Sequence, residues 1–127
     1  MNRAASRHRA VIVDANDDLR ELFTLFLEHC GYDVRSAHTG ALGLACAAEF
    51  APDIVFSSLR VGDVDGYALA RALRKLPQTA GCVLIAMSGF ANEDRAVREA
   101  GFDHYLRKPI SLDDITAILK PLDDVVG

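Results

Sequence analysis

Short apolar runs alternate along the chain with longer stretches of helical periodicity. Five apolar runs predict strands, over residues 10–13, 32–36, 53–57, 82–87 and 103–107. In the intervening stretches apolar residues recur three or four positions apart, which predicts helices over 17–30, 39–50, 67–76, 92–100 and 111–122. Such strict alternation is typical of an α/β domain, a parallel sheet with helices on both faces.

Each main helix carries apolar residues that we expect to pack on the sheet. These are Leu19, Leu22, Phe23, Phe26, Leu27 and Cys30 in the first helix, Ala41, Leu44, Ala45 and Ala48 in the second, Leu69, Leu73 and Leu76 in the third, and Leu112, Ile115, Ile118, Leu119 and Leu122 in the last. Ser111 caps the last helix, with Asp114 as its capping-box partner. Residues 60–66 hold two glycines and two aspartates and predict a loop.

The residues that follow the strands are the candidates for chemistry. Because crossovers are right-handed, few topologies remain, and a five-stranded doubly wound sheet of order 2-1-3-4-5 is expected. Ligands of such sheets bind beyond the carboxyl ends of the strands. Asp14, Ser58, Ser88 and Lys108 follow the first, third, fourth and fifth strands, so these four side chains should meet in one crevice.

Composition restricts the setting of this chemistry. The 127 residues predict a single domain with a core of about 9–122 and flexible tails at 1–8 and 123–127. A net charge of −4 argues against direct binding of nucleic acid. No apolar run is long enough for a membrane span, and the first residues lack the apolar region of a secretory signal.

Three cysteines, Cys30, Cys46 and Cys82, form no close pair in the sequence. An odd, dispersed set argues against a disulfide framework or a zinc site, and each is expected to be a small buried hydrophobic residue. Reduced thiols fit a cytoplasmic location.

Over about residues 9–122 the sequence resembles the receiver domain of two-component response regulators. Five segments carry the resemblance: residues 11–16, 53–56, 65–67, 87–89 and 100–109, which read VIVDAN, DIVF, DGY, MSG and AGFDHYLRKP. The resemblance implies a flavodoxin-like (βα)5 fold and a role in phosphorelay signal transduction.

The resemblance also implies a phosphorylation site, which this chain matches only in part. Receivers place two adjacent acids after the first strand, and here these are Asp14 and Ala15. The phosphoacceptor aspartate corresponds to Ser58, and the conserved hydroxyl and lysine of receivers correspond to Ser88 and Lys108, the latter before a proline whose peptide bond is often cis. The switch aromatic of receivers matches Tyr105, and Val61 and Gly62 stand where receivers often have Met-Pro.

These departures predict a vestigial site. Mg²⁺ needs oxygen ligands, commonly carboxylates, and the two direct carboxylate ligands of receivers match Ala15 and Ser58. Asp14 matches a ligand that reaches the metal through water, and Arg60 adds a cation where receivers supply a main-chain carbonyl. Asp17 could act as a substitute ligand, but a first-turn acid favoured by the helix dipole is the simpler interpretation. We therefore expect weak or absent Mg²⁺ binding, no cofactor and no catalytic residue.

The remaining side chains also have plain structural explanations. The hydroxyl of Ser58 is a poor nucleophile without a base, and its phosphate ester would be too stable for the fast turnover of a phosphorelay. Asp14 and Lys108 can form an ion pair across the strand ends. Ser88 can be a hydrogen-bonded turn residue and Tyr105 a half-buried strand aromatic.

The function expected is that of a signalling module that is not an enzyme, is not phosphorylated, and acts through protein contacts. The resemblance implies a histidine kinase, an output domain or a second receiver as partner, through the face formed by residues 92–122, and a homodimer is one form of such contact. That face includes Glu93, Arg95, Arg98, His104, Arg107 and Asp113, and its short helix, anchored mainly by Val97, should be the most mobile.

Two alternatives remain open. One is a working phosphorelay receiver with an unusual acceptor, Ser58 or Asp53, although Asp53 begins its strand and so lies at the wrong end of the sheet. The other is a small cofactor-binding flavodoxin-like protein. The acidic segment 14–18 lacks the glycines of a phosphate-binding loop, and no P-loop or dinucleotide motif occurs.

Overall fold

A computed structural model describes residues 8–61, 64–89 and 94–126. The strands are β1 (His8–Val13), β2 (Tyr32–Ala37), β3 (Ile54–Ser58), β4 (Arg60–Val61), β5 (Val64–Asp65), β6 (Val83–Ser88) and β7 (His104–Arg107). The helices are α1 (Asp17–His29), α2 (Gly40–Phe50), α3 (Gly66–Lys75), α4 (Asp94–Ala100) and α5 (Leu112–Val126). The five strands and five helices predicted from periodicity are confirmed, with ends that differ by a few residues.

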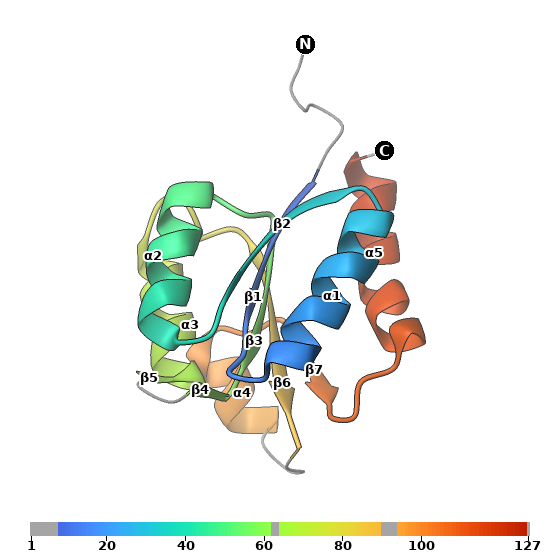
Figure 1. Ribbon diagram of the computed structural model, residues 1–127. Helices are drawn as coiled ribbons and strands as arrows, with labels where there is room; N and C mark the ends of the chain where they lie inside the picture. The colour runs from blue at the N-terminus through green and yellow to red at the C-terminus, as the bar shows by residue number, and fades with distance from the viewer. Residues whose placement is uncertain (1–7, 62–63, 90–93, 127) are drawn as a thin grey trace.

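One parallel sheet organises the molecule. Its strands lie in the order β2-β1-β3-β6-β7, which confirms the predicted 2-1-3-4-5 arrangement. Helices α1 and α5 cover one face, and α2, α3 and α4 cover the other (Figure 1). β1 and β3 are adjacent although a whole βα unit separates them in sequence, so the strand order reverses direction there, and sheets of this kind bind ligands beyond the carboxyl ends at such a point.

The alternation of side chains along the strands divides the core in two. In β1, Val11 and Val13 pack under α2 and α3, whereas Ala10 and Ile12 pack under α1 and α5. The same alternation places Val55 in the first cluster and Phe56 in the second. Both faces of the central strands are therefore buried, which explains why these strands appear in the sequence as continuous apolar runs.

The predicted inner face of α2 is only partly correct: Leu44 packs against the core cluster and Ala48 is half-buried, but the other two residues are misplaced. Ala41 and Ala45 are exposed, and the residues that meet the sheet are Gly40, Gly43 and Ala47. A Cβ atom at Gly43 would lie 2.7 Å from Cγ2 of Val13, so α2 approaches β1 more closely than a larger side chain would allow. The close approach, which requires glycine, turns the alanines outward.

The apolar faces of α1 and α5 are narrower than predicted. Leu22 is 51% exposed, Leu112 is 41% exposed and Cys30 is exposed, whereas Phe23 and Leu27 carry the burial of α1. Helix α1 covers an outer part of the sheet, so a single stripe of its surface suffices for packing. The side chain of Leu122 lies outside the described residues.

Residues 60–66 form more regular structure than the predicted loop. Arg60–Val61 and Val64–Asp65 pair as antiparallel β4 and β5, and Gly66 begins α3. Asp65 caps α3 by accepting a hydrogen bond at Oδ1 from the amide of Ala68, 2.7 Å away. Two-residue strands are too short to produce a periodic pattern, so the sequence could not predict them.

The ends of the domain also extend past the predicted core of 9–122. β1 begins at His8 and α5 continues to Val126. The remaining residues of the predicted tails, 1–7 and 127, lie outside the described residues. Within the described part of the chain, no helix has the length and apolar character that a bilayer crossing requires.

The three cysteines differ in environment, which predicts an order of reactivity. Cys30 is exposed, Cys46 is half-buried, and Cys82 is buried, so the expectation of three buried residues is wrong for Cys30. Burial raises the pKa of the Cys82 thiol to about 11. At pH 8 its thiolate fraction is then about one in a thousand, so iodoacetamide should label Cys30 first and Cys82 last in the native protein. Timed alkylation with peptide mass spectrometry measures this order, and equal labelling of Cys30 and Cys82 without denaturant would contradict it.

Candidate functional site

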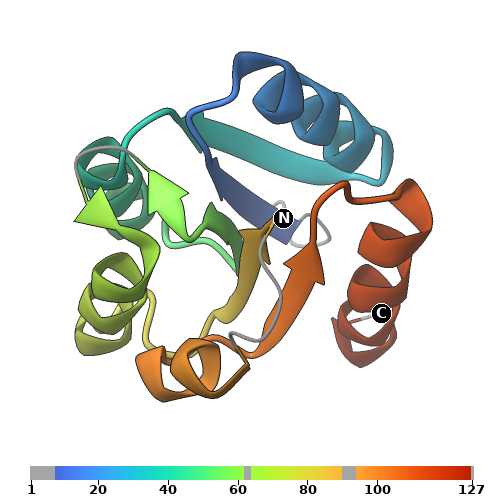
Figure 2. The ribbon, with the colours of Figure 1, turned by 90° about the horizontal axis from the view of Figure 1, so that it is seen from below.

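The carboxyl ends of β1, β3, β6 and β7 lie at one edge of the sheet and bring the candidate residues together. Seen from below, this edge shows the strand ends surrounded by the helices (Figure 2). The register places Ser58 beside Met87 and Ser88 beside Arg107. Asp14 follows β1 and Lys108 follows β7, so Ser58 and Ser88 come from the two strands that lie between them.

Asp14 and Lys108 form an ion pair across this edge. Lys108 Nζ lies 2.9 Å from Asp14 Oδ2, and the side chain of Asp14 is only 4% exposed. Asp14 Oδ1 accepts a second hydrogen bond from the amide of Asn16 at 2.9 Å. The pair predicted from the sequence is confirmed, and it spans the ends of β3 and β6.

The segment after β1 is held by contacts that the sequence analysis did not identify. Asn16 caps α1 by accepting a hydrogen bond from the amide of Leu19, and Arg20 donates one to the main-chain carbonyl of Asp14 at 2.8 Å. Arg20 also pairs with Asp17, whose side chain is 86% exposed. An asparagine before two aspartates is a known N-cap signal, so Asn16 could have been found. Asp17 behaves as the exposed first-turn acid of the simpler interpretation.

The hydroxyl of Ser58 bonds to its own turn. Ser58 is buried, and its Oγ donates a hydrogen bond to the carbonyl oxygen of Arg60 at 3.2 Å and accepts one from the Arg60 amide at 3.3 Å. Within the described residues, no side chain that could serve as a base bonds to Ser58. The Arg60 carbonyl, which accepts the hydrogen bond from Ser58, stands at the position where receivers supply a main-chain metal ligand.

The donors at this edge do not fit a divalent cation. Ala15 is exposed and offers a methyl group where receivers have an acid, and Asp14, the remaining carboxylate, is paired with Lys108. Over residues 8–61, 64–89 and 94–126, no three histidine, cysteine, aspartate or glutamate side chains come close enough to hold a metal ion. Because Mg²⁺ needs several oxygen ligands, the residues present do not match the metal that the resemblance implies.

Ser88 and Tyr105 occupy two different surroundings. Ser88 is buried, and its main-chain carbonyl accepts a hydrogen bond from the amide of Lys108 at 2.8 Å. The peptide bond between Lys108 and Pro109 is cis. Tyr105 is half-buried against the core cluster under α3 and α4, as expected of a strand aromatic.

The predicted contact face, residues 92–122, includes α4, β7 and the first part of α5. Its described charged residues, Arg95, Arg98, His104, Arg107 and Asp113, are all exposed, and Glu93 lies outside the described residues. Val97 is 2% exposed and anchors α4 as predicted, together with Ala100. The mobility expected of this helix stays a prediction.

Asp53, the alternative acceptor, lies at the opposite edge of the sheet. It precedes β3, and its Oδ2 accepts a hydrogen bond from the amide of Arg9 at 2.8 Å. Asp53 therefore ties β1 to β3 at their amino ends, away from Asp14, Ser58, Ser88 and Lys108.

Comparison with known proteins agrees with this architecture. The chain is 34% identical over 124 residues to the transcriptional regulatory protein PrrA of Mycobacterium leprae, covering 96% of this chain and 52% of that protein. It is 31% identical to the sensor histidine kinase RcsC of Salmonella typhi, covering 86% of this chain and 12% of that protein. The chain thus spans about half the length of the regulator and a small part of the kinase.

Solved structures and a family model extend the comparison. The structure of a CheY-like response regulator receiver domain from Methylobacillus flagellatus is similar with a TM-score of 0.78 and 29% identity, covering 94% of this chain and 98% of that one. The family model described as "Response regulator receiver domain" matches residues 10–120. The match covers both the sheet and the edge that carries Asp14, Ser58, Ser88 and Lys108, and the chain belongs to the response regulator receiver domain family.

Proposed function

We propose that this receiver domain works in two-component signalling without being phosphorylated at Ser58 and without Mg²⁺. The observation that carries the proposal is the state of Ser58, whose hydroxyl is buried and bonded to the main chain of Arg60. A phosphoryl group transferred to this oxygen would need a base to remove the proton, and the bond to the Arg60 carbonyl would have to break.

The charge balance at the strand ends supports the same conclusion. Asp14 and Lys108 neutralise each other in a direct ion pair. A divalent cation would therefore meet no excess of negative charge, and it would have to compete with the ammonium of Lys108 for the carboxylate of Asp14.

A domain of this kind acts through protein contacts. The face proposed for these contacts is that formed by residues 92–122, where Arg95, Arg98, His104 and Arg107 are exposed on α4 and β7. Its partner would be a histidine kinase, an output domain or a second receiver. No catalytic residue and no cofactor are part of this proposal.

Incubation with acetyl phosphate and Mg²⁺ tests the proposal. The unmodified protein should keep its intact mass, because Ser58 lacks a base and the metal lacks ligands. A parallel Mg²⁺ titration should leave the NMR signals of Tyr105 and of the amides around Asp14 unchanged. A mass increase of one phosphoryl group, or a saturable titration in the millimolar range, would contradict the proposal. Peptide mapping would then assign the adduct to Ser58 or to another residue.

A further inference from the structure

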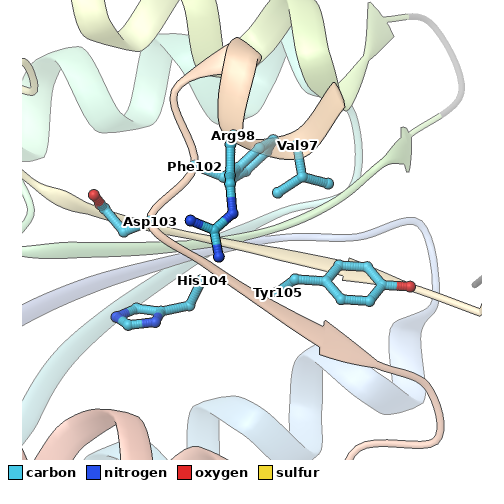
Figure 3. A pocket seen from close by; sticks show the side chains of 6 residues that line it. All are labelled: Val97, Arg98, Phe102, Asp103, His104 and Tyr105. Atoms are coloured by element: carbon cyan, nitrogen blue, oxygen red, sulfur yellow. The ribbon is translucent and has the colours of Figure 1, made fainter. Parts of the chain in front are cut away.

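Helix α4 depends on contacts at its carboxyl end. It has seven residues, and a helix of this length is not stable in water by itself. Among its described side chains only those of Val97 and Ala100 are buried, and Phe102 follows in the turn that leads into β7. Figure 3 shows Val97 on α4 and Phe102 on that turn, whereas the carboxyl group of Asp103 points away from both. The apolar anchors of α4 therefore lie in its second half and in the turn.

The carboxyl end of α4 closes at Gly101. The amide of Gly101 donates a hydrogen bond to the carbonyl of Arg98 at 3.0 Å, and the amide of Phe102 donates one to the carbonyl of Val97 at 3.2 Å. Because Gly101 has a φ of 110°, this is the Schellman arrangement of a helix end. The carbonyl of Gly101 is then bonded by a side chain from another helix, Arg74 of α3.

Arg74 joins three segments through one guanidinium group. Its Nε and Nη2 donate to the carbonyl of Gly101 at 2.9 and 2.6 Å. Its Nη1 donates to the carbonyls of Ala80 at 2.9 Å and Cys82 at 2.6 Å, and Nη2 also lies 2.8 Å from Oδ2 of Asp103. These five hydrogen bonds use all the N–H groups of the guanidinium. We call this set of bonds the Arg74 latch.

The latch is closely fitted but accessible to water. A Cβ atom at Gly101 would lie 2.9 Å from Cγ of Arg74, so the helix end and the arginine stem are in direct contact. Oδ2 of Asp103 also accepts a hydrogen bond from the amide of Leu84 in β6 at 2.9 Å, which ties the turn to the sheet. The side chains of Arg74 and Asp103 are 24% and 46% exposed, so water can replace the bonds of the latch while the sheet stays folded.

We infer that the Arg74 latch is a conformational device that holds α4 in the position seen here, and that α4 has a second position, released from α3 while the sheet remains folded. In the released position the guanidinium of Arg74 bonds to water, and α4 moves about Gly101. The strength of the latch sets the populations of the two positions. The inference goes beyond the proposed function: because α4 belongs to the predicted contact face, the latch gives that face a defined position whatever the state of Ser58.

Native-state hydrogen exchange of the unmodified ¹⁵N-labelled domain is the first test. The amides of Gly101, Phe102 and Asp103 report the turn, because each donates a hydrogen bond there, and the amides of β1 report global unfolding. Local release exposes little surface, so the turn amides should exchange about a hundredfold or more faster than those of β1 and should not respond to low concentrations of urea. A urea dependence equal to that of β1 would overturn the inference, because the turn would then open only when the domain unfolds.

The Arg74→Lys substitution tests the latch itself. Lysine keeps the positive charge, but its donors extend from one nitrogen and cannot reach all three segments. The turn amides should therefore exchange about tenfold or more faster than in the unmodified domain, whereas the rates in β1 should change less. Arg71→Lys, the same replacement at an exposed position of α3 outside the latch, is the matched control and should leave all rates within about twofold. Equal acceleration of the turn and of β1 in Arg74→Lys, or equal effects of the two substitutions, would overturn the inference.

Cys82 provides a second measurement at the same place. It is 7% exposed, and it lies in the core cluster with Val97 and Phe102. Release of α4 should uncover its thiol, so Arg74→Lys should raise the rate of Cys82 alkylation by iodoacetamide about tenfold and leave the rate at Cys46 within about twofold. Lysine retains the charge beside Cys82, so a faster reaction reports exposure. An unchanged rate at Cys82 would contradict the released position. None of these measurements uses a phosphodonor or Mg²⁺, so their failure is distinct from that of the proposed function.

Discussion

The double variant Ala15→Asp/Ser58→Asp is expected to bind Mg²⁺ and to accept a phosphoryl group from acetyl phosphate. The two substitutions supply the carboxylates that receivers of this family place at these positions. Three acids at one edge, with Lys108 retained, provide the oxygen ligands that Mg²⁺ requires. We expect the affinity for Mg²⁺ to rise by about tenfold or more over that of the unmodified domain.

The structure indicates that both aspartates can be accommodated. Ala15 is exposed, so its replacement displaces no core side chain. Ser58 ends β3 at the same edge as Asp14, and the Ser58→Asp substitution would release the carbonyl of Arg60 from its present bond to the serine hydroxyl. Without Mg²⁺ the added carboxylates repel Asp14, so the variant should unfold more easily in EDTA and be stabilised by the metal.

Calorimetric Mg²⁺ titration, intact-mass analysis and thermal unfolding measure these effects. The matched control is Ala15→Asn/Ser58→Asn, which has similar side-chain volumes without the charges and should bind no metal. A folded aspartate variant that neither binds Mg²⁺ nor takes up phosphate would show that the edge has diverged beyond these two positions. The same variant serves as the positive control for the phosphodonor experiment on the unmodified domain.

The features of the fold and of the candidate site that the sequence predicted have causes that lie within short segments of the chain. Burial on both faces of the central strands produced apolar runs that located the sheet. Strict alternation with right-handed crossovers then left few strand orders, and the expected order 2-1-3-4-5 is the one observed. The ion pair of Asp14 and Lys108 was predictable because both residues follow parallel strands, and such ends share one edge. The capping pair of Ser111 and Asp114 was predictable from a spacing of three residues, and both of its hydrogen bonds are present.

The features that escaped prediction depend on contacts between distant segments. Which face of α2 is buried depends on the close approach of Gly43 to Val13, and an alanine-rich helix gives no sign of that approach. Arg74 of α3 joins this helix to the turn before β7 by donating hydrogen bonds to the carbonyls of Gly101, Ala80 and Cys82. These contacts escaped because main-chain carbonyls exist at every residue and leave no pattern in the sequence. The small pocket lined by residues of α4, β7 and the turn between them (Figure 3) escaped as well, because its lining comes from separate elements.

Replacement of Lys108 by methionine is expected to lower the free energy of unfolding by about 3 kcal/mol, because it leaves the carboxylate of Asp14 buried without its cation. Methionine keeps much of the apolar stem of lysine, so the loss is mainly electrostatic. Asp14 is 4% exposed and would retain the single hydrogen bond from the amide of Asn16 among those described. Urea denaturation at pH 7, compared with the unmodified domain, measures the difference.

The second replacement, Asp14→Asn, separates the cost of the unpaired carboxylate from the worth of the pair. In the double variant Asp14→Asn/Lys108→Met no buried charge remains, so much of the lost stability should return, with a coupling energy of about 2 kcal/mol or more between the two sites. Additive losses in the two single variants would mean that Lys108 contributes nothing through Asp14. In that case the ion pair would not stabilise the fold, and competition from Lys108 for Asp14 would no longer explain an absence of Mg²⁺ binding.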